Sequence, residues 1–261
     1  MKKNSAEEKK EGGVISIANC KGGVGKTTLT VNIAYELAFQ GHSVALLDLD
    51  NQCDLSKIYL PEGHHGPTIM DVLQKQSTLA NALVEVEENL YLIPGSREIA
   101  QLNYSGSEHI LQKVIAGIKK RNVDFVLLDH PPSMHEAALA GYVASDYVLI
   151  VSEAEAFSVM NLSQLLEDIA AIKSAFRPEL RVLGIVMNKI DRRRNLTKKT
   201  LKACNEAFGK SNTLFHTTIS IDTAIPNSHA LKIPVRKLHW RSRTVSQFSE
   251  LTREILERMS K

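Results

Sequence analysis

The sequence predicts an α/β fold: a single domain with a mostly parallel, twisted sheet that carries helices on both faces. Two observations lead to this prediction. From Val14 onward, short apolar runs rich in β-branched residues alternate with longer runs in which apolar residues recur every three or four positions. This alternation is typical of strands and helices that form a parallel sheet. The length of 261 residues, 43% of them apolar, suits one packed core.

The composition argues against several classes of protein. The three cysteines, Cys20, Cys53 and Cys204, lie far apart and form no C-x-x-C pair. They therefore indicate no zinc site, disulfide or iron–sulfur cluster, and a reducing cytoplasm is the simplest setting. No apolar run is long enough to span a membrane, and no apolar segment follows the N-terminal lysines. We therefore expect a cytoplasmic protein that is neither secreted nor inserted in a membrane.

Residues 1–13 read MKKNSAEEKKEGG, a segment that mixes charges of both signs, lacks aromatic residues and ends in two glycines. This composition is typical of a disordered, charged tail. The predicted domain therefore comprises residues 14–261.

A glycine-rich loop separates the first predicted strand, 14–18, from the first predicted helix, 28–40. Glycines let backbone N–H groups converge on phosphate oxygens, and the N-terminus of the following helix adds a positive field. Lys26 supplies a charge for the β- and γ-phosphates, and Thr27 supplies a hydroxyl for Mg²⁺. A strand, a glycine loop and a helix in this order predict a nucleotide site. The loop residues are Lys21, Gly22, Gly23, Val24, Gly25, Lys26, Thr27 and Thr28.

Two further strands end in aspartates. The buried-strand run 43–48 leads into Asp48-Leu49-Asp50. We expect its two carboxylates to point the same way, at the carboxyl end of the strand, where ligands bind in open α/β sheets. The apolar run 124–129 delivers Asp129 at its end, an arrangement in which the acid holds Mg²⁺ through water. The adjacent His130 is expected to be a spacer rather than a catalytic group.

The remaining elements follow from the spacing of apolar residues. Thr68 is expected to cap a short helix, and the other helices carry apolar residues three and four positions apart. The predicted helices are 68–74, 107–121 and 157–173, and the predicted strands are 90–93, 147–152 and 182–188.

The nucleotide motifs together resemble those of the ParA/MinD family of ATPases. The segment KGGVGKTT closely resembles the deviant Walker A motif of that family. Asp48 to Gln52 resembles its D-x-D-P-Q segment, and Asp129 to Ser133 resembles its D-C-P-P-S segment. Departures from the family pattern are Asn51 for proline, Cys53 for glycine, Asp54 for asparagine and His130 for cysteine.

The resemblance implies the fold of P-loop NTPases, ATP and Mg²⁺ as cofactors, and ATP hydrolysis that is slow until a partner stimulates it. It implies that Lys21 reaches across a homodimer, formed on ATP binding, to the partner's nucleotide. Lys21, Lys26 and Asp50 would then be the catalytic residues, with Asp50 positioning or activating the attacking water. Thr27, Asp50 and Asp129 would lie at the metal.

Two segments are candidates for contacts to the base. The strand 182–188 ends at Asn188, whose amide can both donate and accept hydrogen bonds, and relatives use this vicinity for adenine. The stretch Ile225-Pro226-Asn227 resembles a family segment that lines the base. The resemblance therefore implies base contacts from Pro226 and Asn227.

Positive charge is concentrated in one part of the chain. Between Arg192 and Arg243 there are 12 lysines and arginines but two acidic residues, whereas the remainder has a net charge of −7. Such a block favours a polyanionic partner, with a solvated charged face as the alternative. ParA relatives bind DNA without sequence preference through this part of the chain. No recognition helix or set of stacking aromatics is apparent, so phosphate contact is expected. The candidates are Arg192, Arg193, Arg194, Lys198, Lys199, Lys202, Arg236, Arg241 and Arg243.

The C-terminal segment, 245–261, has apolar residues at helical spacing, which allows two interpretations. It is either the closing helix of the domain or a membrane-surface helix like that of MinD relatives. Its polar face carries Glu250, Glu254 and Glu257 beside two arginines. A helix that binds acidic lipid should be more basic, so packing on the core is favoured.

With the resemblance, the sequence favours a ParA/Soj-type ATPase that dimerises on ATP, binds nonspecific DNA in that state and releases it on hydrolysis. Such a cycle would drive DNA partition or cargo positioning on the nucleoid, with a ParB-like centromere-binding protein as partner and no membrane. A MinD-like membrane-cycling ATPase is the main alternative. A scaffold that binds ATP without hydrolysing it is another, if the altered residues around Asp50 disable the switch. An iron-protein-like reductase would need cluster cysteines that the chain does not have.

Overall fold

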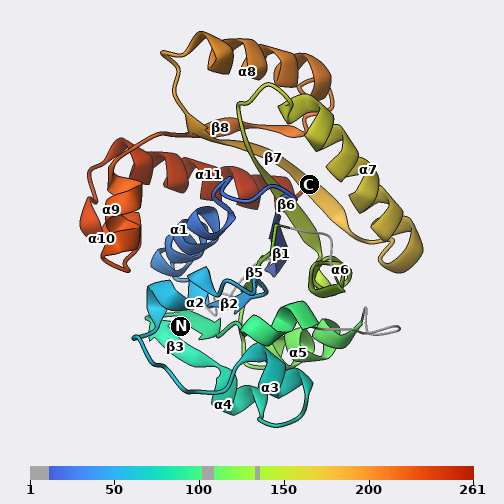
Figure 1. The fold of residues 1–261 in the computed structure, drawn as a ribbon, viewed down its shortest axis with the longest axis vertical. Coiled ribbons are helices and arrows are strands. Elements are labelled where there is room, and N and C mark those ends of the chain that lie inside the picture. The colour runs from blue at the N-terminus through green and yellow to red at the C-terminus, as the bar shows by residue number, and fades with distance from the viewer. Residues whose placement is uncertain (1–11, 102–108, 133–135) are drawn as a thin grey trace, which may run out of the picture.

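The computed structural model describes residues 12–101, 109–132 and 136–261, and eight strands within these ranges form one sheet (Figure 1). The strand order is β3-β4-β2-β5-β1-β6-β7-β8. Every neighbouring pair is parallel except β3 and β4, which confirms the predicted mostly parallel sheet. The strands are β1 (Gly13–Ala18), β2 (Val44–Asp48), β3 (Val84–Glu87), β4 (Leu90–Ile93), β5 (Phe125–Asp129), β6 (Tyr147–Glu153), β7 (Arg181–Ile190) and β8 (Leu214–Ser220).

Helices cover both faces of this sheet, as the alternating pattern predicts (Figure 1). One face carries α1 (Lys26–Phe39), α2 (Asp54–Tyr59), α9 (Ala224–Ala230), α10 (Val235–Leu238) and α11 (Arg243–Met259). The other carries α3 (Ile69–Leu73), α4 (Leu79–Ala82), α5 (Ile110–Lys119), α6 (Glu136–Ala144), α7 (Ser158–Phe176) and α8 (Asn195–Phe208). A short 3-10 helix spans Arg97–Gln101.

The central strands are buried on both faces, which explains their continuous apolar runs. In β1, Ile15 and Ile17 pack beneath α1 and α11, whereas Val14 packs beneath α5. In β5, Leu127 and Leu128 divide between the two faces in the same way. Successive side chains of a strand point to opposite faces, so these runs supply both cores at once.

Several predicted boundaries shift in the structure. Of the predicted tail 1–13, residues 1–11 lie outside the described residues, and Gly13 already pairs with Phe125 in β1. The first helix starts at Lys26 rather than at Thr28. The start of the predicted helix 107–121 also lies outside the described residues. Thr68 caps α3 as predicted, since its hydroxyl accepts a hydrogen bond from Asp71 N.

Several helices and strands were not predicted from the spacing of apolar residues, among them α6, β3 and β8. Helix α6 is buried nearly all round and so has no polar face that would mark it as amphipathic. Strands β3 and β8 lie at the two edges of the sheet and are only partly buried, so their sequences are less apolar. Edge strands give a weaker signal because water replaces one neighbouring strand.

The C-terminal helix α11 packs on the core, as its charge pattern indicates. Its own residues Phe248, Leu251 and Ile255 are buried against the sheet and α1. The guanidinium of Arg258 donates to the backbone oxygens of Leu183 and Asn212 at 2.9 and 2.7 Å. These bonds fasten the helix to β7 and to the segment before β8. Across the described part of the chain, no helix is both long and apolar enough to cross a bilayer.

A buried ion pair joins α1, α10 and α11. Glu36 on α1 has only 4% of its side chain exposed, and Arg236 Nε and Nη2 donate to its two carboxylate oxygens at 2.6 and 2.7 Å. Ser249 Oγ donates to the same carboxylate at 2.8 Å. The guanidinium of Arg236 also lies over the ring of Phe39. The half-buried guanidinium of Arg236 is therefore already bound to a carboxylate, which argues against its expected contact with DNA.

We predict that Arg236→Met destabilises the protein by about 3–5 kcal/mol, because it leaves the carboxylate of Glu36 buried without its partner. Denaturant unfolding measures this loss. The double variant Arg236→Met/Glu36→Leu should recover most of it. Lys237→Met is the matched control: it removes the neighbouring, more exposed pair with Glu87 and should cost less than about 1 kcal/mol. Equal losses in the two single variants would contradict a structural role for Arg236.

Candidate nucleotide-binding site

The glycine loop between β1 and α1 has a backbone conformation that suits phosphate binding. Gly23 and Gly25 have φ angles of 75° and 97°, in the region that favours glycine. A Cβ atom at Gly25 would lie 2.2 Å from Asn188 Nδ2, so a larger residue would displace that amide. Helix α1 starts at the next residue, Lys26, and directs its N-terminus at the loop. Loop and helix N-terminus together form an anion site.

Two side chains from the end of β7 hold this loop in place. Asn188 Nδ2 donates to Val24 O at 2.8 Å, and Lys189 Nζ donates to Gly23 O. Lys189 is also ion-paired with Glu153 at 2.8 Å. Asn188 is buried. The expected contact of Asn188 with the base stays a prediction, and the contact that the structure shows is with the backbone of the loop.

Lys26 is placed to neutralise phosphate charge. Its side chain is buried, and Nζ donates to Lys21 O at 3.2 Å. Burial lowers the pKa of this amine, while the carboxylates of Asp129 and Asp50 act in the opposite direction. The amine therefore lies beside acidic groups that favour its charged form.

Thr27 and Asp129 meet at the end of β5. Thr27 Oγ1 donates to Asp129 Oδ2 at 2.7 Å, and Thr30 Oγ1 donates to the other carboxylate oxygen at 3.3 Å. Asp129 is 1% exposed. Burial, and then the carboxylate of Asp48 beside it in the sheet register, raise the pKa of Asp129 to about 8. A cation next to this carboxylate would relieve that cost.

The hydroxyl of Thr27 and the carboxylate of Asp129 suit Mg²⁺, which needs few protein ligands, better than they suit a metal ion that is coordinated by protein side chains alone. Across residues 12–101, 109–132 and 136–261, no group of three or more His, Cys, Asp or Glu residues is gathered to hold a metal ion. Mg²⁺ usually takes one or two carboxylates and completes its shell with water and substrate phosphates. The hydroxyl of Thr27 and the carboxylate of Asp129 could supply the protein's share.

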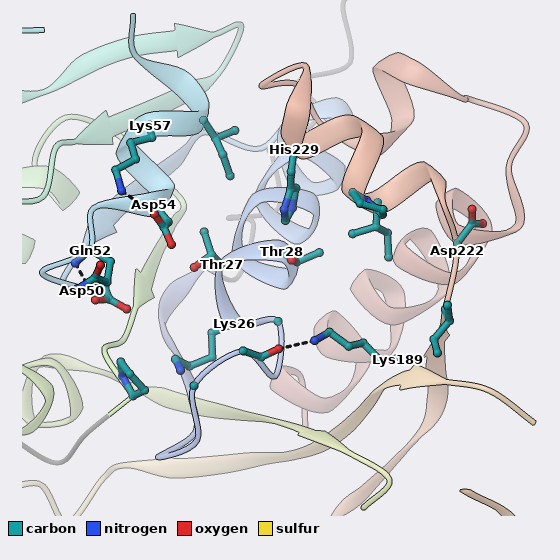
Figure 2. A pocket seen from close by; sticks show the side chains of 18 of the residues that line it. Lys26, Thr27, Thr28, Asp50, Gln52, Asp54, Lys57, Lys189, Asp222 and His229 are labelled. Carbon is teal, nitrogen blue, oxygen red and sulfur yellow. Dashed lines mark hydrogen bonds and ion pairs between the residues drawn. The ribbon is translucent and has the colours of Figure 1, made fainter. Parts of the chain in front are cut away.

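Asp48, the last residue of β2, and Asp50, two residues later, do not point the same way, contrary to expectation. Asp48 is buried and accepts hydrogen bonds from Ser56 N at 2.9 Å and Ser56 Oγ at 2.6 Å. Burial raises the pKa of Asp48 to about 6. Asp50 instead lines a cavity (Figure 2). Strand β2 ends at Asp48, so the alternation of side chains does not extend to Asp50.

A cavity of about 900 Å³ lies over the glycine loop. It is lined by the loop and the start of α1, by the segment from Asp50 to Ile58, and by residues 220–232 around α9 (Figure 2). Of the two expected base contacts, Pro226 lines the cavity, and Asn227 is an exposed residue of α9 outside its lining. The volume is in the range of small-molecule sites.

The sequence pattern missed several residues of the cavity wall. Lys57, His229 and Lys232 line it, and Figure 2 shows His229 pointing into it from α9. His229 Nε2 is buried without a hydrogen-bond partner in the described residues, and burial lowers the pKa of its ring. Lys57 and His229 lie on the short helices α2 and α9, and Lys232 lies in the turn after α9. All three are distant from the loop in the chain, and no local pattern links them to it.

Lys21 lies outside the lining of its own chain's cavity. Its Nζ donates to Glu155 Oε2 at 2.5 Å, and the two side chains are 47% and 52% exposed. The hydrogen bond from Lys21 lowers the pKa of the Glu155 carboxyl. Exposed ion pairs of this kind contribute little stability, so Lys21 can exchange this partner for another at small cost.

The candidates for DNA contact fall in two places. Those at 192–202, before and within the first half of α8, are all exposed. Arg193 in this group is paired with Asp191 at 2.8 Å. The second place is the segment between α10 and α11 together with the first residue of α11, where Arg241 and Arg243 are exposed. Arg236 is the exception, because its guanidinium is bound to Glu36.

Cys53, where the resembling family has glycine, adopts a backbone conformation that suits glycine. It precedes α2 with φ 54° and ψ 34°. This left-handed conformation costs a residue with a Cβ about 1–2 kcal/mol. Burial raises the pKa of its thiol to about 11, so it is not a nucleophile near neutral pH. The chain therefore carries strain in the loop that holds Asp50.

We predict that Cys53→Gly raises the free energy of unfolding by up to about 1 kcal/mol, because relief of the strain exceeds the added flexibility of the unfolded chain. Cys53→Val should lower it by about 1 kcal/mol or more, since a β-branched residue is least suited to positive φ. Thermal unfolding of the three proteins measures the order. Cys20→Gly, outside the positive-φ region, is the control and should not stabilise. A less stable Cys53→Gly protein would show that residue 53 is not strained.

Comparisons with known proteins agree with this geometry. A family model described as an AAA domain matches residues 12–182. An uncharacterised protein of Pseudomonas putida is 31% identical over 252 residues, which cover 94% of this chain and 95% of that protein. The chromosome partitioning protein ParA of Caulobacter vibrioides is 26% identical over 253 residues, which cover 94% of each chain.

Solved structures share the fold. The Cyanothece McdA(D38A)–ATP complex superposes with a TM-score of 0.83 at 20% identity, over 95% of this chain and 97% of that one. Cobyrinic acid a,c-diamide synthase from Mycobacterium smegmatis, with bound ADP and magnesium, gives a TM-score of 0.76 at 24% identity, over 95% of each chain. The family match, the partition relative and the glycine loop that faces Asp129 lead to one conclusion: this chain belongs to the ParA/MinD family of P-loop ATPases.

Proposed function

We propose that this protein is a dimerising ATPase that binds nonspecific DNA in its ATP state and releases it on hydrolysis. The observation that carries the proposal is the placement of Lys26 and Thr27 in the wall of a cavity of about 900 Å³ over the glycine loop, with Asp129 hydrogen-bonded to Thr27 directly behind it. This arrangement offers backbone N–H groups and a buried amine to phosphates, and a hydroxyl and a carboxylate to Mg²⁺. Solved relatives with ATP, or with ADP and magnesium, support the choice of ligands.

Each part of the site has a task in this proposal. The glycine loop and Lys26 bind and orient the phosphates, and Mg²⁺ beside Thr27 and Asp129 would neutralise their charge. Asp50 faces the cavity from the turn after β2, where its carboxylate accepts a bond from Gln52 N at 2.9 Å. There it can orient a water molecule or take its proton. Pro226 offers an apolar wall for the base, and Asn227 and Asn188 are further candidates for base contacts.

Lys21 is the residue that would link ATP binding to the formation of a homodimer. In the single chain it is held by Glu155 at the surface. In the ATP-bound homodimer it would leave Glu155 and contact the partner's nucleotide, which ties dimerisation to ATP. Hydrolysis by Lys21, Lys26 and Asp50 would then be slow in the free protein, where Lys21 is paired with Glu155, and would respond to a partner.

The partner and the setting rest on the resemblance to partition proteins. Exposed arginines and lysines at 192–202 and 241–243 would neutralise phosphates of nonspecific DNA, and a dimer would align two such surfaces. The protein would then partition DNA or position a cargo on the nucleoid, in the cytoplasm, with a ParB-like centromere-binding protein as stimulating partner. Burial of the apolar face of α11 argues against the MinD-like alternative, which needs that face for lipid.

We predict that Asp50→Asn lowers the turnover of Mg·ATP at least about 100-fold and leaves nucleotide binding in place, because only the water-orienting carboxylate is lost. Phosphate release measures turnover, and a fluorescent ATP analogue measures binding. Lys26→Ala should lose binding itself. Glu88→Gln, an exposed residue of the β3–β4 turn, is the control. Unchanged turnover in Asp50→Asn would rule out the proposed role of Asp50.

We predict that a labelled nonspecific duplex binds only with Mg·ATP, and not with ADP or without nucleotide. Fluorescence anisotropy across a salt series measures this, and the affinity should fall steeply with salt. Lys21→Ala should abolish binding, and Arg243→Ala should weaken it and reduce the salt slope by about 1. Arg253→Ala, on the exposed face of α11, is the matched control. Equal binding in all three nucleotide states would mean that nucleotide does not switch the basic surface.

A further inference from the structure

The one tryptophan of the chain is on the surface. Trp240 lies between α10 and α11 and is 64% exposed. The guanidinium carbon of Arg241 lies 4.2 Å from the centre of its ring. An exposed indole offers a large apolar face together with one N–H donor, a combination that is enriched in binding surfaces.

This ring borders a second cavity, of about 490 Å³. Leu238, His239, Trp240, Arg241 and Ser242 line one side of it, and residues 222–224 line the other. Asp222 and Thr223 also line the nucleotide cavity, so the two cavities share one stretch of wall. A ligand of the second cavity would therefore lie next to the nucleotide.

The charged side chains in and beside this second cavity that have no hydrogen-bond or ion-pair partner in the described residues are positive. In the described part of the chain, Arg241 and Arg243 form no ion pair, whereas Lys237 is paired with Glu87. The nearby acid, Asp222, is already satisfied: it accepts hydrogen bonds from Ala224 N at 2.8 Å and from Thr244 Oγ1. Those bonds, that from Thr244 first, lower the pKa of its carboxyl. An anion fits this place better than a cation.

The chemistry of the surface favours DNA over a lipid surface. A membrane-binding segment needs a broad apolar face, and the other apolar residues from Ile233 to Leu238 are buried or half-buried. One unpaired guanidinium group beside an aromatic ring, with a second, Arg243, two residues further along the chain, suits a nucleic acid, because arginines neutralise phosphates and a ring can pack on a sugar.

We propose that Trp240, Arg241 and Arg243 form one DNA-contact site, in which the arginines bind phosphates and the indole ring packs against the DNA. This rests on the proposed DNA-binding function and adds an aromatic, non-ionic contact to the phosphate contacts expected from the sequence. This DNA-contact site would lie next to the nucleotide cavity, because Asp222 and Thr223 line both cavities.

The single tryptophan provides a direct test on the full-length protein. Nonspecific duplex DNA, added with Mg·ATP, should quench or shift the emission of Trp240. Unchanged emission under conditions in which labelled DNA is bound would overturn the proposal. A larger emission change with vesicles of anionic phospholipid than with DNA would also overturn it, in favour of a lipid surface.

Variants separate the ring from the charges. Trp240→Ala should weaken binding of labelled DNA about tenfold and leave the salt slope unchanged, because a packing contact of an uncharged ring releases no counterions. Trp240→Phe should keep most of the affinity. Arg241→Ala should weaken binding and reduce the salt slope by about 1. Phe176→Leu, at an exposed aromatic residue on α7, and Arg253→Ala are the controls.

The outcomes distinguish this proposal from the function on which it rests. Wild-type affinity in Trp240→Ala would overturn the aromatic contact and leave ATP-dependent DNA binding intact. Absence of DNA binding by the wild-type protein in every nucleotide state would overturn both. Because Trp240 is mostly exposed, its replacement should not affect folding, and an unchanged unfolding midpoint would verify this.

Discussion

The parallel register of β1, β5 and β2 is the constraint on which the site depends. Ile17 and Asp48 both pair with Asp129, so the three strands finish side by side at the carboxyl-terminal end of the sheet. The glycine loop and the turn that carries Asp50 leave the sheet at this end, and the carboxylate of Asp129 lies there as the last residue of β5. Because parallel strands finish on the same side, residues distant in the chain come together there without a long loop.

Buried charge is the consequence of this arrangement. Asp48 and Asp129 lie side by side, nearly without solvent, and burial raises the pKa of both. The protein satisfies Asp48 internally, through Ser56, and Ser56 Oγ in turn accepts a hydrogen bond from Gly95 N. Asp129 has two hydroxyl donors, and the nearby ammonium group of Lys26 partly offsets the rise that burial causes in the pKa of its carboxyl. The difference explains why Asp48 is structural and why Asp129 is suited to a cation.

The second half of the sheet connects this site to the basic surface. Asn188 and Lys189, at the end of β7, hold the loop, and the segment after β8 forms the wall between the two cavities. Within the same stretch of sequence, Arg236 is bound to buried Glu36, whereas Arg241 is free of ion pairs in the described structure. Arginines close together in the sequence therefore differ in role: Arg236 stabilises the fold, and Arg241 is available to bind a partner.

The sequence alone determined the fold class, the glycine loop and the strand that ends in Asp129, because each is encoded by residues adjacent in the chain. Its apolar runs and glycines follow local steric and periodic rules. Only the tertiary structure decided that Asp48 turns inward and that Asn188 holds the loop. It alone placed Arg236 in a buried ion pair and brought His229 and Lys57 to the cavity. Each of these depends on a contact between distant segments, and a side chain's solvation and partner are set by that contact rather than by its neighbours in sequence.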